Sequence, residues 1–282
     1  MDFTKKLQLE ELDETPFFDL NKPPFDVEAH TVYSVISGSR AYGTNVAGSD
    51  VDIRGVMIPP LRYFTGLGTI DQIDNQSKDI CYYSLRRFFE LAYKNNVHAL
   101  EMLYMHPDTV NFIKPSMQYV LDNRSLFLSK NLAYSFGGYS HQQILQMDLK
   151  RVNNTGRVDL IEKHGYDTKM FMHAVRLFRM GSEALLTGEL TVKRPDAAEL
   201  LEIRDGKYTL EEAVQLEKKE VEFTEKDGKT VRKKMKTIVT GGFIKKEADK
   251  FAEAHANSKL PALPDFKKIE ELLMYIHHQT LA

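Results

Sequence analysis

The sequence of 282 residues contains a single cysteine, Cys81. One cysteine cannot build a disulfide framework, and it excludes a zinc site made from several cysteines. An excess of positive charge is also missing, because 38 Lys and Arg residues are balanced by 40 Asp and Glu, for a formal net charge of -2. The chain therefore has no overall positive field that would hold nucleic acid, and any basic binding surface must be local.

Long apolar runs and repeats are absent as well. No apolar run approaches the roughly 18 residues that a membrane-spanning helix requires. The first 30 residues carry eight acidic and three basic side chains, a composition unlike a signal or transit peptide. Hydrophobic residues make up 42% of the chain, which is enough to bury a core and excludes a mostly disordered protein. We expect a protein of the reducing cytoplasm with no membrane partner.

The N-terminal part predicts three strands. Residues 30–37, 50–58 and 78–83 are rich in β-branched and aromatic side chains, as buried strands are. A loop with a short helical turn is expected from Gly38 to Ser49. Ser84 is a predicted N-cap, because apolar residues follow it at helical spacing, namely Leu85, Phe88, Phe89 and Ala92.

From about residue 97 the pattern is helical nearly throughout. The expected helices cover 166–188, 197–203, 208–220 and 265–279, and Asp227-Gly228 predicts a β-hairpin over 221–239. The predicted fold class is α+β. A small mixed sheet with helices forms a core over residues 1–115, followed by a helical domain over 116–282 with an inserted lysine-rich hairpin near 218–242.

Two carboxylates in the segment 37–55, SGSRAYGTNVAGSDVDIRG, suggest a metal site. If a strand begins at Asp50, then Asp50 and Asp52 share one face with Cα atoms ~6–7 Å apart, and Val51 faces a core. Two carboxylates pressed together repel each other unless a cation lies between them. Oxygen ligands without Cys or His suit Mg²⁺, which shares its remaining positions with substrate phosphates. Alone, Asp-x-Asp is more often a solvated strand edge.

The Gly38-Ser39 pair adds a second element. Glycine lets the backbone approach a phosphate closely, and Ser39 offers a hydroxyl and an N–H at the head of a short helix. Most such pairs are only turns. The combination is more specific. An apolar strand, Gly-Ser, about ten residues and then Asp-x-Asp resembles the DNA polymerase β nucleotidyltransferase superfamily.

That resemblance implies metal-assisted nucleotidyl transfer. A hydroxyl attacks the α-phosphate of an NTP and pyrophosphate leaves. A third carboxylate on a neighbouring strand completes such a site and helps to activate the hydroxyl. Asp79 is the best candidate, because it opens the third predicted strand, and Glu101 is the alternative. The competing interpretation is that Asp79 has no catalytic role.

The resemblance narrows further on the segment GSRAYGTNVAGSDVDIRGVMIPP. This segment, and others that begin at Asp79, Lys169 and Arg194, resemble the RNA-repair-pathway polymerase β family (RlaP-type). By resemblance, Gly38 and Ser39 hold the triphosphate, and Asp50 and Asp52 bind Mg²⁺, with Mn²⁺ as an alternative ion. The family's association with RNA repair implies an RNA end, chiefly of tRNA, as acceptor. The acidic leader and the lysine-rich segment 218–242 depart from the family pattern.

Further polar residues flank these motifs. Arg40, Tyr42 and Arg54 are candidate nucleotide-binding residues, although Arg54 could equally form a structural ion pair. A second group recurs at i, i+4 and i+7 and therefore shares one helix face, which is either a triphosphate or RNA contact or a solvated surface. Its members are Lys169, His173 and Arg176. His173 has no partner at a metal-ligand spacing.

Other candidates favour ordinary structural roles. Residues 217–236 carry eight basic and five acidic side chains, and their cluster 232–236 could grip an RNA backbone with Phe223 available for stacking. A charged, solvated hairpin is the favoured interpretation. Tyr139 and Phe136 could stack a base, but core packing is favoured, and Cys81 is expected to pack as a small hydrophobe.

The sequence thus predicts a Mg²⁺-dependent nucleotidyltransferase that moves an NMP from an NTP to a hydroxyl. Its predicted catalytic and metal-binding residues are Asp50, Asp52 and Asp79. One alternative keeps this chemistry with a protein side chain or a small molecule as acceptor. Another is a nucleotide-binding module without catalysis.

Overall fold

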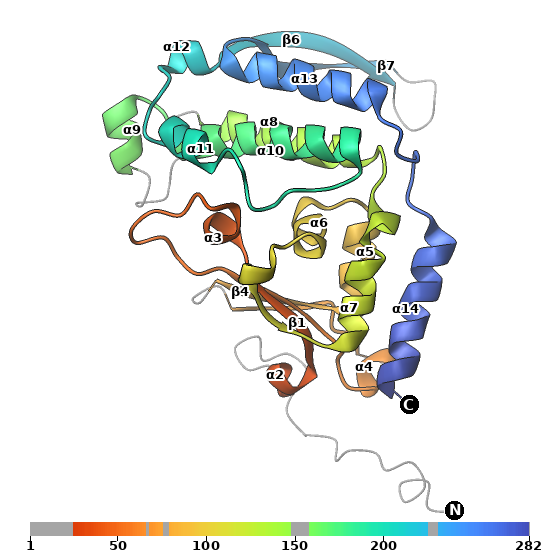
Figure 1. The fold of residues 1–282 in the computed structure, drawn as a ribbon. Coiled ribbons are helices and arrows are strands. Elements are labelled where there is room, and N and C mark those ends of the chain that lie inside the picture. The colour runs from red at the N-terminus through yellow and green to blue at the C-terminus, as the bar shows by residue number, and fades with distance from the viewer. Residues whose placement is uncertain (1–24, 66–67, 76–78, 148–157, 225–230, 282) are drawn as a thin grey trace, which may run out of the picture.

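A computed structural model describes residues 25–65, 68–75, 79–147, 158–224 and 231–281 (Figure 1). The chain is mixed α+β, as the sequence predicts, with a five-stranded mixed sheet and a separate two-stranded sheet. The strands of the larger sheet are β1 (Thr31–Ile36), β2 (Ile53–Met57), β3 (Gln72–Asn75), β4 (Ile80–Ser84) and β5 (Val110–Ile113).

The larger sheet has the order β3-β4-β2-β1-β5. β1 runs antiparallel to β2 and β5, β3 runs antiparallel to β4, and β2 and β4 are parallel. The three predicted strands are confirmed as β1, β2 and β4. β5 overturns the expectation of helix from residue 97 onward. It is a four-residue edge strand with exposed Asn111 and Phe112, too short for a periodic signal.

Helices pack on this sheet. α5 (Leu85–Tyr93) follows β4 directly, and the Ser84 side chain accepts a hydrogen bond from the Arg87 backbone N–H at 3.2 Å. Its buried residues are the predicted ones, Leu85, Phe88, Phe89 and Ala92. The helices nearby are α3 (Gly38–Tyr42), α6 (Val97–Leu103), α7 (Pro115–Asp122) and α14 (Phe266–Leu281), which corresponds to the predicted helix 265–279.

A second helical layer lies above these helices (Figure 1). Its central helix is α10 (Thr168–Thr187), which contacts α8 (Leu132–Gln146), α11 (Ala197–Arg204) and α13 (Phe243–Asn257). Asp167 caps the start of α10, and Gly188 ends it with φ +74°. The predicted helix 166–188 is therefore confirmed. After α13 the chain returns as α14, which packs against α5 and α7.

The second sheet is a hairpin of β6 (Gln215–Thr224) and β7 (Val231–Gly241). The predicted hairpin is confirmed, and its predicted turn at residues 227–228 lies outside the described residues. The predicted helix 208–220 is wrong, because only α12 (Leu210–Ala213) is helical there. Residues from Gln215 onward have helix-forming side chains, but pairing with β7 overrides that local preference.

Short elements complete the described chain. They are α2 (Val27–His30), α4 (Arg62–Thr65), α9 (Val158–His164), and the 3-10 turns η2 (Pro107–Thr109) and η3 (Arg124–Phe127). None of the helices within the described ranges is long and apolar enough to cross a membrane. A division near residue 115 stays a prediction.

Candidate active site

The Asp-x-Asp segment lies at the end of the loop between α3 and β2. The sequence predicts a strand from Asp50, but β2 begins only at Ile53, and Val51 is 45% exposed rather than buried in a core. Backbone hydrogen bonds fix Asp52, because its carbonyl accepts from Ser37 N–H at 2.8 Å. The next residue, Ile53, donates its N–H to the carbonyl of Asp79 at 2.9 Å. Asp52 therefore lies between the end of β1 and the start of β4.

Gly38 leaves the space that the Asp52 carboxylate occupies. A Cβ built on Gly38 would lie 1.9 Å from Oδ2 of Asp52, far inside van der Waals contact. The backbone of Gly38 has φ +64°, in the left-handed region that favours glycine. Ser39 follows, and its carbonyl accepts a hydrogen bond from Thr44 N–H at 2.9 Å, which closes the turn. We call residues 38–44 the Gly-Ser turn.

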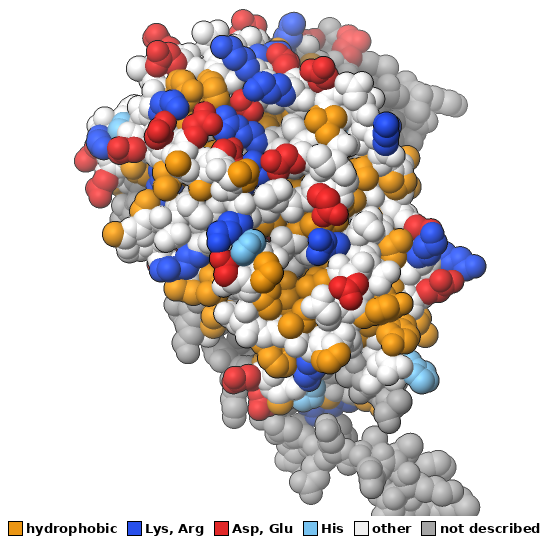
Figure 2. All heavy atoms as spheres, in the orientation of Figure 1, with side chains coloured by type: hydrophobic (Ala, Val, Ile, Leu, Met, Phe, Trp, Pro, Cys, Tyr) orange, Lys and Arg blue, Asp and Glu red, His pale blue; other side chains and the backbone are white. Residues whose placement is uncertain are grey.

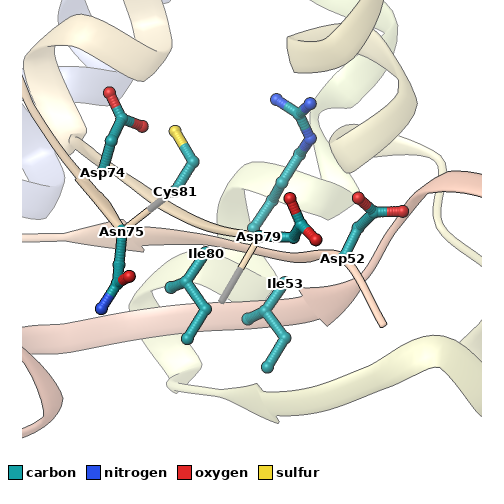
Figure 3. Close-up of a pocket in the computed structure, with 8 residues that line it drawn as sticks. Asp52, Ile53, Asp74, Asn75, Asp79, Ile80 and Cys81 are labelled. Carbon is teal, nitrogen blue, oxygen red and sulfur yellow. The ribbon is translucent and has the colours of Figure 1, made fainter. Parts of the chain in front are cut away.

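Asp79 lies immediately before β4, beside Asp52. In Figure 3 the carboxylates of Asp52 and Asp79 lie next to each other on one side of the sheet, whereas Ile53 and Ile80 point to the other side. Both acids line a cavity of about 290 Å³. Asp79 has φ +50°, an uncommon conformation for a residue other than glycine. Such backbone strain is often found at functional sites.

The same cavity is lined by a further acid that the sequence did not indicate, Asp74. Asp74 on β3 pairs in register with Cys81 on β4, and both line the cavity together with Arg54. Burial, and then the neighbouring Asp74 carboxylate, raises the pKa of Cys81 to about 11. Cys81 also packs against the core, as expected for a small hydrophobe. Asp74 gave no sequence signal because β3 is a short strand with three exposed residues.

Negative charge accumulates around Asp52. Burial raises the pKa of its carboxyl, and the charges of Asp79 and Asp50 raise it further. Arg54 and Lys169 act in the opposite direction. The site therefore has an energetic need for a cation or for a bound proton.

The donor set of this site fits Mg²⁺ with an incomplete protein shell. In the described part of the chain, no three His, Cys, Asp or Glu side chains gather closely enough to hold a metal by themselves. Mg²⁺ is usually held by one or two carboxylates together with water and substrate phosphates, so this arrangement suits it. Of the three predicted acids, Asp52 and Asp79 could hold such an ion together, whereas Asp50 lies in the exposed loop before β2, near enough for its charge to raise the pKa of Asp52.

Two basic residues lie near the Asp52 carboxylate. Arg54 lies on β2 in the cavity wall and donates a hydrogen bond from Nη1 to the Tyr83 hydroxyl at 2.9 Å. Lys169 comes from the first turn of α10 and is near enough to lower the pKa of Asp52. Arg40, an expected nucleotide-binding residue, contacts the loop before β2. Its guanidinium donates to the carbonyls of Ser49 at 3.0 Å and Asp50 at 3.2 Å, and so braces the acidic loop.

The structure buries two of the expected nucleotide-binding residues. Tyr42 is 5% exposed and Arg176 is 2% exposed, and both contact Glu101. They differ from the expectation because their polar atoms are directed into the interior. Glu101, the alternative third carboxylate, is paired with Arg176 at 2.7 Å instead of facing Asp52. Asp79 is therefore the better placed of the two candidates.

Several remaining candidates lie between the two layers or in the core. His173 is half-buried on α10, and burial followed by the charges of Arg176 and Lys169 holds its pKa well below the usual value, so its imidazole is neutral at pH 7. Tyr139 is half-buried and packs edge-on against His98, with ring centroids 5.6 Å apart. Phe136 is fully buried, as core packing predicts.

The lysine-rich hairpin is exposed. Met235 is 56% exposed, and Lys219 on β6 lies directly opposite Lys236 on β7. The side chains of Phe223 and residues 232–234 lie outside the described set. On the face shown in Figure 2, basic and acidic side chains are interspersed over the upper helical layer.

Comparison with known proteins identifies one family. The family model described as "RNA repair pathway DNA polymerase beta family" matches residues 14–275. The chain is also 30% identical over 138 residues to an uncharacterised 38.9 kDa protein encoded in the nrdC-mobD intergenic region of Enterobacteria phage T4. That match covers 43% of this chain and 39% of the phage protein, so the chain spans well under half of that relative. No solved structure matches the chain significantly.

Proposed function

The chain belongs to the RNA repair pathway DNA polymerase beta family, a family of nucleotidyltransferases in the general sense, and we propose that it transfers an NMP from an NTP to a hydroxyl acceptor. The observation that carries this proposal is the convergence of Gly38, Asp52 and Asp79 at one end of β2. A glycine turn packed against the Asp52 carboxylate, which lies next to that of Asp79, suits a metal-bound triphosphate.

The proposed reaction is an in-line displacement at the α-phosphorus. The acceptor hydroxyl oxygen forms a bond to this phosphorus while the bond to the bridging oxygen of the β-phosphate breaks. The electron pair of the broken bond leaves with pyrophosphate, and the hydroxyl proton passes to a carboxylate. Asp79 is our candidate for that base, because it lies beside Asp52 at the cavity wall.

Asp52 and Asp79 would hold Mg²⁺, which when bound would supply charge neutralisation at the attacking and leaving oxygens. The protein contributes the remaining positive charge. Lys169 approaches from α10 and Arg54 from β2, so the triphosphate would lie between the helical layer and the sheet. Ser39 offers a hydroxyl and a backbone N–H at the start of the Gly-Ser turn. In this arrangement His173, held neutral, can donate a hydrogen bond without adding charge.

An RNA end is our proposed acceptor. The family description connects the chain with RNA repair. The hairpin gives local support, because Lys219 and Lys236 lie opposite each other and are exposed. Like charges in directly opposite positions destabilise a strand pair, and a phosphate backbone bound across them would relieve that repulsion. A protein or small-molecule acceptor is the alternative, and the experiment below separates them.

The test is label transfer from each of the four NTPs, labelled at the α-phosphate, with Mg²⁺ and with purified tRNA, whole-cell protein or small metabolites as separate acceptors. The proposal expects label on tRNA that disappears in Asp52→Asn. Label on protein or metabolites alone would retain the reaction and overturn the RNA acceptor. NTP binding without pyrophosphate release under any condition would overturn catalysis and leave a binding module.

A further inference from the structure

A buried, charged cluster lies directly behind the Gly-Ser turn. Tyr42 is the last residue of α3, Glu101 belongs to α6, and Arg176 belongs to α10. The Tyr42 hydroxyl donates to Oε2 of Glu101 at 2.9 Å, and Nη1 of Arg176 donates to Oε1 of Glu101 at 2.7 Å. The guanidinium carbon of Arg176 lies 3.5 Å from the centre of the Tyr42 ring. Each member thus contacts the other two.

These contacts are poorly explained by stability alone. Taking an ion pair out of water costs about as much as the attraction returns, and apolar replacements are often neutral or stabilising. Within the described residues, Nε of Arg176 has no hydrogen-bond acceptor, which adds to the cost of burial. Burial alone would raise the pKa of Glu101, but Arg176 and His98 lower it to about 2, so the pair is fully charged at neutral pH. What the cluster provides is a defined geometry.

That geometry concerns the far end of the Gly-Ser turn. The near end is fixed by the contact between Gly38 and Asp52. At the far end, the Tyr42 carbonyl accepts from Arg194 N–H at 3.1 Å, and the Thr44 carbonyl accepts from Arg204 at 3.4 Å. The Tyr42 side chain adds the connection to α6 and α10. The turn is therefore held between the sheet and the helical layer.

The same helix carries Lys169, seven residues before Arg176. These two residues share one face of α10, and Lys169 is close enough to the acidic cluster to affect Asp52. A shift of α10 relative to α3 would change the separation between Ser39 and Lys169, the two groups proposed to hold the triphosphate. The buried cluster connects the helices that carry them.

We propose that Tyr42, Glu101 and Arg176 form a positioning clamp that sets the distance between the Gly-Ser turn and α10, and thereby pre-organises the nucleotide site. The clamp residues touch no substrate, and the inference rests on the proposed function for its catalytic consequence. Its structural consequence, order in the turn, can be measured without turnover.

The chain offers a matched control for this clamp. Tyr33 on β1 is also a buried tyrosine, and its hydroxyl donates to the carbonyl of Met102 at 2.8 Å, one residue from Glu101. Tyr33→Phe and Tyr42→Phe each remove one buried hydroxyl and keep the ring. Only Tyr42→Phe removes the hydrogen bond from α3 to Glu101 on α6, the residue that in turn pairs with Arg176 on α10. Both variants are expected to lose melting temperature, and Tyr42→Phe somewhat more, because its hydroxyl donates to a charged acceptor.

The first readout is amide hydrogen exchange measured by mass spectrometry on the full-length protein. We expect amides of residues 38–44 to exchange about tenfold faster in Tyr42→Phe, as for removal of a hydrogen bond to a charged acceptor, and to be unchanged in Tyr33→Phe. The second readout is steady-state kinetics. Tyr42→Phe should raise KM for the NTP about three- to tenfold and leave kcat within about twofold, with Tyr33→Phe unchanged in both.

The outcomes separate the clamp from the proposed function. Equal exchange rates for residues 38–44 in the two variants would overturn the clamp, whether or not the wild-type protein turns over NTP. Faster exchange in Tyr42→Phe, in a protein that neither binds nor turns over NTP, would keep the positioning of the turn and overturn its link to nucleotide binding. Arg176→Lys retains the charge without the planar stacked group, and should give an intermediate increase in exchange.

Discussion

Gly38 and Asp52 are packed so closely that the Asp52 carboxylate occupies the place of a side chain on Gly38. A Cβ atom at Gly38 would lie 1.9 Å from Oδ2 of Asp52. A residue fourteen positions away in the chain thus depends on this glycine for its rotamer. This close packing connects the Gly-Ser turn with the Asp-x-Asp segment, so Gly38 and Asp52 are parts of one site.

Gly38→Ala is expected to abolish turnover. The new methyl group must displace Asp52, and alanine at φ +64° adds a backbone cost of about 1 kcal/mol. Gly48→Ala is the matched control, because Gly48 has φ +79° with no atom within 4 Å of the Cβ position. Thermal melts should show a loss of stability in both variants, and an activity assay should show inactivation in Gly38→Ala alone. Equal activities would contradict this account.

Asp52→Asn is expected to stabilise the protein when no divalent ion is present. Because burial and neighbouring acids raise the pKa of Asp52, the folded state holds the proton more tightly than the unfolded state. The favourable contribution of Asp52 is therefore present at low pH and is lost as the pH rises through the raised pKa. At pH 7 the melting temperature of the variant should exceed that of the wild type by on the order of 2 °C.

Added Mg²⁺ supplies the complementary measurement. It should raise the melting temperature of the wild type by relieving the carboxylate repulsion, and should have little effect on Asp52→Asn. A variant that melts lower than the wild type without divalent ions would show that Asp52 is stabilising, contrary to the like-charge interpretation.

Asp79→Asn should reduce kcat by about a hundredfold or more, the usual contribution of a positioned general base. Asparagine tolerates the left-handed backbone conformation of Asp79 at φ +50°, so the fold should be retained. Asp74→Asn changes another acid of the same cavity and should leave kcat within a few fold. The idea fails if the two variants lose activity equally.

Lys169→Met should raise the Kd for the NTP about tenfold or more while the protein stays folded, because a point charge on the triphosphate is removed. Lys163→Met provides the comparison. Lys163 lies on α9, is 62% exposed and pairs with Asp205 at 2.9 Å. Isothermal titration with a non-hydrolysable NTP analogue measures both. Unchanged affinity in Lys169→Met would remove Lys169 from the nucleotide site.

The double variant Lys219→Gln with Lys236→Gln should bind tRNA more weakly. A plot of log affinity against log salt concentration should also become less steep, by about one unit of slope for each phosphate that the lysines no longer neutralise. NTP affinity should not change, since the hairpin is separate from the cavity. Lys267→Gln with Lys268→Gln on α14, where the two side chains are 85% and 64% exposed, is the charge-matched control. An identical salt slope for the hairpin variant and the wild type would exclude these lysines as RNA contacts.

The parts of the site that could be predicted are local in sequence. Spacing and side-chain type are sufficient to find these parts, because each depends on residues close together in the chain. They are the Gly-Ser turn, Asp52, the start of β4 near Asp79 and the Ser84 cap. Asp79 follows from its place before an apolar strand. The exact start of β2 could not be predicted. Asp50 and Val51 continue the alternating polar and apolar pattern of the strand, but they are exposed loop residues.

Other parts depend on contacts that spacing does not encode. Tyr42 and Glu101 are 59 residues apart, and Glu101 and Arg176 are 75 residues apart, so the clamp exists only once three helices have packed. The i, i+4, i+7 pattern places Arg176 with Lys169 correctly on one face. It cannot show that the same face lies near Asp52 at Lys169 and enters the interior at Arg176.

The most direct measurement of the central claim compares two positions of the label in the NTP. Wild-type protein, Mg²⁺ and tRNA are incubated with NTP labelled at the α-phosphate or, separately, at the γ-phosphate. Nucleotidyl transfer predicts that acceptor label comes from the α-position alone, with one pyrophosphate released per transfer, and that Asp52→Asn abolishes it. Acceptor label from the γ-position, or transfer from the α-position that persists in Asp52→Asn, would contradict the account.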